Sequence, residues 1–205
     1  LDEIDREYQQ QIRRLLAHDD LTGLLSSRSF FSELRRELGR AKQQSRTLCV
    51  LMMDVDFFKL VNDTYGHLTG SKTLEEIGLC INETLRSGDV AARFGGEEFA
   101  AFLLDSGLPQ ALIAAERIRK AIEEYPFSVI KKGRPADKHN ITISIGVSSF
   151  PDDSNDPIEL VEMADSALYR AKSLGRNKVC AYRELTEEEE RSPLPSREEL
   201  QKEFD

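Results

Sequence analysis

Two short acidic segments contain the residues of this chain that are best suited to do chemistry. The first is Gly95-Gly96-Glu97-Glu98, which joins two apolar runs of strand length, 90–94 and 99–104. Glycines permit the positive φ angles of a tight turn and let the backbone approach a ligand closely. Two adjacent carboxylates repel each other, a local cost expected where a metal ion or ligand offsets it. Taken alone, this pattern more often marks a solvated hairpin tip.

The second segment lies about forty residues upstream, where Asp54 and Asp56 end an apolar run. The unbroken run 48–53 predicts a buried strand, and alternation places both carboxylates on one side of the chain if the strand continues. Together with Glu97 on a neighbouring turn, they would form the hard-oxygen site that Mg²⁺ prefers when it also carries substrate phosphates. A strand-terminal Asx turn is the alternative for a single Asp. Two converging segments favour the metal site.

The elements that must position these acids alternate along the chain. Pro109 and Pro157 suit first helical turns, and Gly175 suits a helix end. Helices alternating with strands, including hairpin-linked antiparallel pairs, predict an α+β fold. The predicted helices span 29–43, 69–85, 109–124 and 157–173, and the predicted strands span 47–53, 90–94, 99–104, 127–130, 141–148 and 178–182.

Five sequence blocks, in this order and spacing, resemble the GGDEF family of diguanylate cyclases. The blocks are 19–28 (DDLTGLLSSR), 54–70 (DVDFFKLVNDTYGHLTG), 95–99 (GGEEF), 141–147 (ITISIGV) and 164–179 (ADSALYRAKSLGRNKV). The resemblance covers about residues 19 to 183. It implies a palm-like, ferredoxin-related fold, in which a central, mostly antiparallel sheet is flanked by helices.

The resemblance implies a nucleotidyl cyclase that joins two purine nucleoside triphosphates into a 3′,5′-cyclic dinucleotide and releases pyrophosphate. In such a reaction the protein mainly positions groups and neutralises charge. By analogy with the family, Asp54, the Val55 carbonyl and Glu97 hold Mg²⁺, with Mn²⁺ as the alternative ion. Glu98 belongs near the same site. Whether Glu97 also accepts the hydroxyl proton is open at this point.

Basic residues and backbone amides provide the expected phosphate contacts. Lys59 follows the acidic strand end, and the amides of Phe57 and Phe58 precede it, which together suit a phosphate cradle. Lys172 and Arg176 resemble the family's β- and γ-phosphate contacts. Lys59 alone would read as a surface lysine, and cations near a helix C-terminus are common for dipole reasons.

Ser71 departs from the family pattern at the residue that reads the base. Family members usually have Asp there, which accepts hydrogen bonds from guanine N1–H and the 2-amino group, while the residue matching Asn62 contacts the same base. A carboxylate only accepts, so it disfavours adenine, whereas a serine hydroxyl donates or accepts. Serine resembles the hybrid promiscuous subclass, which makes cyclic GMP-AMP from GTP and ATP alongside cyclic di-GMP and cyclic di-AMP. The alternatives are an ordinary GTP-specific cyclase that makes only cyclic di-GMP and a chain decaying toward inactivity.

A second set of residues resembles the family's inhibitory site for its product. Arg86 and Asp89 have the spacing of the RxxD motif, and Arg117 matches the secondary arginine. Arginines bind phosphates and stack on bases, so a cyclic dinucleotide clamp is expected. The alternatives are a surface Arg–Asp pair of little energetic value and a non-catalytic receptor that binds cyclic dinucleotide.

The chain divides into three predicted parts: an N-terminal helix at 1–18, the catalytic domain at 19–183 and a charged extension at 184–205. Apolar residues recur in the helix at three- and four-residue steps, which fits a coiled-coil seam or a helix folded onto its own domain. The family resemblance favours the signalling helix. Because each domain would hold one nucleotide, we expect a homodimer formed through this helix. A dimerising signalling module without catalysis is a third hypothesis.

Composition bounds the remaining possibilities. The chain has 205 residues, which suits a single domain with extensions, and its formal charge of −9 argues against non-specific binding of nucleic acid. No apolar run is long enough to cross a bilayer. Three cysteines lack metal-binding spacing and are expected to be buried thiols. We expect a bacterial cytoplasmic domain excised from a longer protein, either membrane-tethered or a response regulator.

Overall fold

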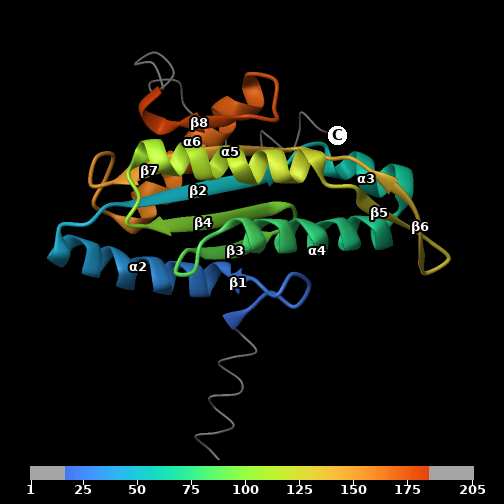
Figure 1. The fold of residues 1–205 in the computed structure, drawn as a ribbon, viewed down its shortest axis with the longest axis horizontal. Helices are drawn as coiled ribbons and strands as arrows, with labels where there is room; N and C mark the ends of the chain where they lie inside the picture. The colour runs from blue at the N-terminus through green and yellow to red at the C-terminus, as the bar shows by residue number, and fades with distance from the viewer. Residues whose placement is uncertain (1–16, 185–205) are drawn as a thin grey trace, which may run out of the picture.

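The computed structural model describes residues 17–184, and Figure 1 shows a central sheet with helices on both faces. The six strands lie in the order β1-β3-β4-β2-β7-β8, and β5 and β6 form a separate pair. The strands are β1 (Leu25–Ser26), β2 (Leu48–Val55), β3 (Val90–Gly95), β4 (Glu98–Leu104), β5 (Phe127–Lys131), β6 (Arg134–His139), β7 (Ile143–Phe150) and β8 (Val179–Ala181). The helices are α2 (Ser27–Gln44), α3 (Phe58–Tyr65), α4 (His67–Thr84), α5 (Leu108–Glu124) and α6 (Pro157–Ser173), followed by the short 3₁₀ helix η1 (Tyr182–Glu184).

Strand β2 lies at the centre of the sheet and is antiparallel to both of its neighbours. Its first residue, Leu48, pairs with Leu104 of β4 and Phe150 of β7. Only the outer pairs, β1 with β3 and β7 with β8, are parallel. The sheet is therefore mixed but mostly antiparallel, which confirms the predicted α+β class.

Both faces of β2 are buried, which explains why its sequence is an unbroken apolar run. Cys49, Leu51 and Met53 pack in the core beneath α4 and α5. The alternate residues, such as Val50 and Met52, pack in the core beneath α2 and α6. Because helices cover both faces, chemistry is confined to the strand ends and the loops around them.

Two strands, one α-helix and the 3₁₀ helix η1 were not predicted from the sequence. Helix α3 buries only Phe58 and Val61, too little apolar periodicity over its eight residues to indicate a helix. Strand β6 is polar and almost wholly exposed, so only its pairing with β5 defines it. Strand β1 has two residues. The predicted strand 141–148 is also shifted, because β7 pairs with β2 as far as Phe150.

Several predictions concern residues outside the described range. The N-terminal helix at 1–18 and the extension at 184–205 fall almost entirely there, including the seam residues Ile4 and Tyr8. Within residues 17–184, no helix is both long and apolar enough to cross a membrane. The three cysteines are buried free thiols, as predicted.

Candidate active site at the end of β2

The two acidic segments meet at one end of the central sheet. Asp54 lies opposite Glu98 of β4 and Ser144 of β7 in the strand register. The Val55 N–H donates a 3.2 Å hydrogen bond to the carbonyl of Glu97. This bond holds the β3–β4 turn over the end of β2, so the chain places Asp54, the Val55 backbone, Glu97 and Glu98 side by side.

The β3–β4 turn depends on two glycines and on an arginine that precedes them. Gly95 and Gly96 have φ angles of 140° and 51°, which residues other than glycine rarely adopt. The Arg93 guanidinium donates to the Gly96 carbonyl at 2.7 Å and also reaches the Asp19 carboxylate at 3.2 Å. Arg93 therefore ties the turn to the opening segment of the domain. No role for Arg93 was predicted from the sequence, although an arginine beside the turn and the acidic pair 19–20 upstream could have suggested this contact.

Burial and mutual repulsion shape the electrostatics of the acidic corner. Burial raises the pKa of Asp54 to about 7, although Lys172, whose ammonium lies 2.9 Å from its carboxylate, acts to lower it. Burial also raises the pKa of Glu97, and the nearby charge of Glu98 acts in the same direction. The corner therefore holds more negative charge than its surroundings stabilise. A cation would relieve this cost.

The donor set at this corner fits a hard divalent cation. Two carboxylates and a main-chain carbonyl are oxygen ligands of the kind that Mg²⁺ prefers, and the remaining positions would go to water and phosphate. Among residues 17–184, no group of three or more His, Cys, Asp or Glu side chains is gathered as a ready-made metal cage.

Basic side chains and backbone amides from separate elements surround the same corner. Phe57 is left-handed, with φ of 55°, and α3 begins at the next residue without a side-chain cap. The first amides of α3 are thus suited to an anion. Lys59 lies exposed on this first turn. The Arg176 guanidinium stacks over the Phe57 ring at 4.6 Å from its centroid, and Lys172 approaches from the end of α6.

The predicted base-reading residues lie where α3 and α4 touch. A Cβ atom at Gly70 would overlap the side-chain oxygen of Asn62, so glycine allows this close approach. Ser71 is the next residue and is exposed on α4. The structure therefore places Asn62 against Gly70, one residue before Ser71.

Asp56 has a different role from that expected of a second acid beside Asp54. Its carboxylate accepts hydrogen bonds from Thr142 and Ser144 hydroxyls, both at 2.7 Å, and from the Asn177 N–H at 3.0 Å. Three protein donors occupy its oxygens in a buried setting. Asp56 therefore joins β2, β7 and the turn after α6 instead of adding a ligand to the acidic corner.

The predicted inhibitory residues lie apart from this corner, near the ends of α4 and β4. The Asp89 carboxylate accepts from the backbone N–H groups of Arg86, at 3.2 Å, and Leu104, at 3.1 Å. Arg117 of α5 donates at 2.6 Å to the carbonyl of Thr84, two residues before Arg86. Asp89 thus shapes the turn, and the two exposed arginines lie on adjoining segments.

A helix-flanked, mostly antiparallel sheet with acidic and basic groups gathered at one strand end is typical of nucleotide-handling domains. Comparison with known proteins narrows this class. Residues 16–178 match the family model "Diguanylate cyclase, GGDEF domain". The chain belongs to the GGDEF diguanylate cyclase family.

Individual relatives agree with this assignment. Diguanylate cyclase A of Treponema denticola is 42% identical over 172 residues, covering 82% of this chain and 45% of that protein. The response regulator PleD of Caulobacter vibrioides is 38% identical over 181 residues, covering 85% of this chain and 39% of that protein. The chain thus spans less than half the length of these relatives.

Solved structures support the fold. A crystal structure of the coiled coil and GGDEF domain of DgcB from Caulobacter crescentus, in complex with c-di-GMP, has a TM-score of 0.78 and 32% identity, covering 87% of this chain and 92% of that one. The active GGEEF domain of a diguanylate cyclase from Vibrio cholerae has a TM-score of 0.71 and 31% identity, covering 79% of this chain and 98% of that one.

Proposed function

We propose that this domain is a diguanylate cyclase that condenses two GTP molecules into cyclic di-GMP with release of pyrophosphate. The observation that carries the proposal is the meeting of Asp54 and Glu97 at the end of β2, beside Lys172 and the first turn of α3. Family membership and relatives named diguanylate cyclase support the same activity.

The chain's own residues would supply positioning and charge. Asp54, the Val55 carbonyl and Glu97 would hold Mg²⁺, with Glu98 close by, and Mn²⁺ is the alternative ion. When bound, the ion neutralises charge on the phosphates and lowers the pKa of the attacking hydroxyl. Lys59 and the amides of Phe57 and Phe58 would bind phosphate oxygens, and Lys172 and Arg176 would bind the distal phosphates. Positioning of this kind accounts for most of the catalysis in phosphoryl and nucleotidyl transfer.

The direct test is product analysis by mass spectrometry after incubation with Mg²⁺ and GTP. We expect cyclic di-GMP and pyrophosphate, and neither without the divalent ion. Asp54→Asn is the matched inactive control, because it keeps the volume of the side chain and removes one ligand charge. A full-length protein that makes no cyclic dinucleotide from GTP would refute the proposal and leave the receptor hypothesis in place.

A second candidate function, the use of ATP, depends on one residue. Ser71, exposed on α4, has a hydroxyl that can donate or accept a hydrogen bond, and it lacks the carboxylate that would disfavour adenine. The names of the relatives favour GTP, and formation of cyclic GMP-AMP stays a prediction. Incubation with equal GTP and ATP tests it, because the mixed product has its own mass.

We also propose that Arg86, Asp89 and Arg117 form an inhibitory site for the product. The two arginines are exposed on adjoining segments, and Asp89 holds the turn that presents Arg86. Guanidinium groups of this kind suit phosphates and bases. Added cyclic di-GMP should slow the initial rate of the parent enzyme, and the Arg86→Ala variant should resist this inhibition.

A further inference from the structure

We propose that Arg119, on α5, is a positioning residue that holds the 175–177 turn, and with it Arg176, at the phosphate side of the active site. The inference rests on the proposed function, because it assigns to Arg119 the placement of a nucleotide-binding group. Arg119 itself contacts none of the predicted site residues. Its influence would pass through Asn177, which directly follows Arg176.

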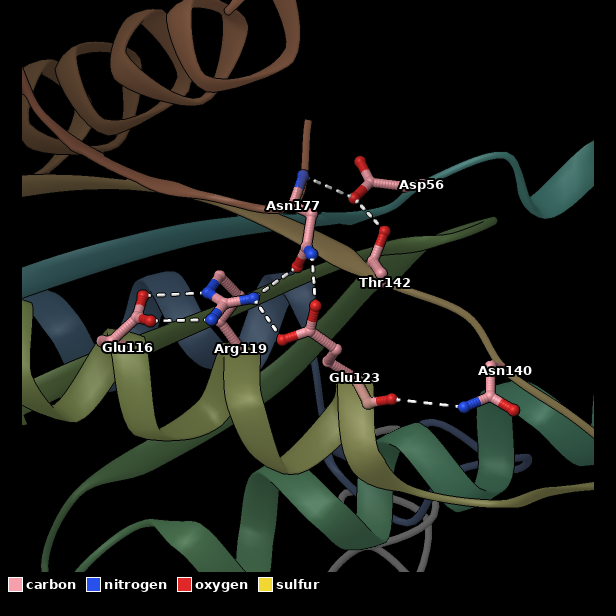
Figure 2. A network of polar contacts seen from close by, with 7 residues as sticks. All are labelled: Asp56, Glu116, Arg119, Glu123, Asn140, Thr142 and Asn177. Carbon is pink, nitrogen blue, oxygen red and sulfur yellow. Dashed lines mark hydrogen bonds and ion pairs between the residues drawn. The ribbon is translucent and has the colours of Figure 1, made fainter. Parts of the chain in front are cut away.

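The contacts of Arg119 make it the centre of a polar network, drawn in Figure 2. Its guanidinium donates to both oxygens of Glu116, at 2.7 and 2.9 Å, and to Glu123 at 2.8 Å. The same nitrogen that reaches Glu123 also donates to the Asn177 side-chain oxygen at 2.6 Å. The Asn177 amide nitrogen in turn donates to Glu123 at 2.7 Å. The Arg119 side chain is only 11% exposed, whereas those of Glu116 and Glu123 are 43% and 41% exposed, so the network lies at the edge of the solvent.

Asn177 connects this network to the acidic strand end. Its backbone N–H donates to Asp56 at 3.0 Å, and Asp56 follows the proposed metal-binding segment directly. Figure 2 shows the backbone nitrogen of Asn177 facing Asp56, while the side chain of Asn177 points toward Arg119 and Glu123. Asn177 therefore fixes the turn between α5 and the end of β2.

The backbone of this turn needs such support. Arg176 and Asn177 have φ angles of 60° and 48°, two consecutive left-handed residues that are not glycine. Residues other than glycine adopt this region at a cost, and the surrounding contacts must hold them there. In this conformation, the Arg176 guanidinium stacks on Phe57 at the start of α3. If Asn177 lost these hydrogen bonds, the backbone of the turn could leave its left-handed conformation, and the Arg176 side chain would lose its position over Phe57.

The test compares two variants of α5 in the full chain. Arg119→Lys keeps the charge, but a single ammonium cannot reproduce the planar fork that spans Glu116, Glu123 and Asn177. Glu116→Ala is the matched control, because it removes an Arg119 partner of similar exposure on the side away from Asn177. The readout is the Kd of a non-hydrolysable GTP analogue with Mg²⁺, measured by calorimetry, with thermal unfolding recorded for each variant.

We expect Arg119→Lys to weaken analogue binding about tenfold, in line with the cost of misplacing a binding group, and Glu116→Ala to bind like the parent. Arg176→Ala supplies the decisive background. If Arg119 acts through Arg176, Arg119→Lys adds no further loss of affinity in the Arg176→Ala protein, because coupled residues are not additive. A purely structural role would weaken binding equally in both backgrounds and would overturn the inference.

A further variant, Glu123→Ala, covers the case in which Arg119→Lys fails to fold. Glu123→Ala removes the acid that holds both Arg119 and Asn177, on an exposed helix face. We expect a smaller loss of affinity that again disappears in the Arg176→Ala background. Parent-like binding in the folded Arg119→Lys and Glu123→Ala proteins overturns the inference but leaves the proposed function in place. A parent chain that binds no GTP analogue overturns the proposed function, and the inference falls with it.

Discussion

Asp54 illustrates at the residue scale how function and stability oppose each other. Its carboxylate is buried beside Glu97 and Glu98, and Lys172 is the cation that offsets this charge. A fold selected for stability alone would not bury Asp54 within reach of the charges of two further acids. The arrangement is suited to a site whose charge is completed by a bound ion.

We predict that Asp54→Asn abolishes cyclase activity while the metal-free protein keeps or gains stability. The amide removes a buried charge from a repulsive cluster, so the free energy of unfolding should stay the same or rise by up to about 1 kcal/mol. Activity assays and thermal unfolding without metal measure the two effects. A large loss of stability would show that the Lys172 ion pair contributes more than the repulsion costs.

We predict that Ser71→Asp shifts the product toward cyclic di-GMP when GTP and ATP are both present. The carboxylate accepts from guanine but meets a lone pair on adenine N1, so it selects against ATP. Mass spectrometry of the mixed reaction gives the ratio of products. Ser71→Ala, which removes the hydroxyl without adding charge, is the control, and an unchanged ratio in Ser71→Asp would contradict the argument from base recognition.

At the scale of elements, the packing of α6 on β7 positions Lys172. A Cβ atom at Gly146 would overlap the carbonyl oxygen of Ala164 and the amide nitrogen of Leu168, so α6 lies directly against the strand at this point. Glycine here permits close approach, because its own φ angle is not left-handed. The distance between α6 and the sheet therefore sets where the end of α6 meets Asp54.

We predict that Gly146→Ala destabilises the fold by about 3 kcal/mol, because helix backbone cannot move aside as a flexible side chain can. Gly39→Ala in α2 is the matched control, since a Cβ there meets nothing within 4 Å. Because Gly39→Ala replaces a glycine inside a helix, it should raise the free energy of unfolding by up to about 1 kcal/mol. Denaturant unfolding measures both values. Equal stabilities would show that α6 can shift on the sheet at little cost.

The β5–β6 hairpin is attached to α4 partly through a buried histidine. The His139 ring lies 2.8 Å from the Thr73 hydroxyl and against the rings of Tyr65 and Phe127. Burial lowers the pKa of His139 below its ordinary value, although Asn140 and Glu76 act to raise it. The folded state therefore favours the neutral ring.

We predict that part of the protein's stability is lost as the pH falls below the ordinary histidine pKa of about 6.5. The sign follows because the unfolded chain binds the proton more readily than the folded one. The His139→Gln variant stays neutral and can still bind Thr73, so its melting temperature should fall less between pH 7.5 and 5.5. Parallel curves for the parent and the variant would exclude this histidine as a source of the acid sensitivity.

At the scale of the whole molecule, residues 17–184 bring the acids at the end of β2 and the basic side chain of Lys172 to one corner of the domain. The proposed condensation needs the hydroxyl of one nucleotide to face the α-phosphate of another, so we propose that two domains meet during the reaction. We propose that residues 1–18 promote this meeting as a helix, that 19–183 form the catalytic domain and that 184–205 are a charged extension.

We predict that activity per protomer rises with protein concentration and then reaches a plateau as dimers fill. Replacing Ile4 and Tyr8 with Asp should move the rise to higher concentration, because charges in the seam oppose pairing. Sedimentation measured over the same range reports the oligomeric state. Constant activity per protomer in a sample that sediments as a monomer would contradict the two-domain requirement.

The sequence alone determined the fold class, most element positions and the segments that build the acidic corner. These conclusions depend on local patterns: apolar runs, turn glycines and short motifs around Asp54 and Glu97. Such patterns report on a residue's own backbone and face, so a single chain reveals them. The short α3 and the polar β6 were not predicted, because their own apolar patterns are too weak and only packing in the folded structure defines them.

Tertiary structure decided which polar groups act together. Asp56 and Asn177 are 121 positions apart, yet one hydrogen bond joins them, and Arg93 reaches Asp19 across 74 positions. The same adjacency gives Asp54 its partner Lys172 and assigns Asp56 to a structural network. No local pattern encodes these pairings, because they arise only when the sheet brings distant segments within hydrogen-bond distance.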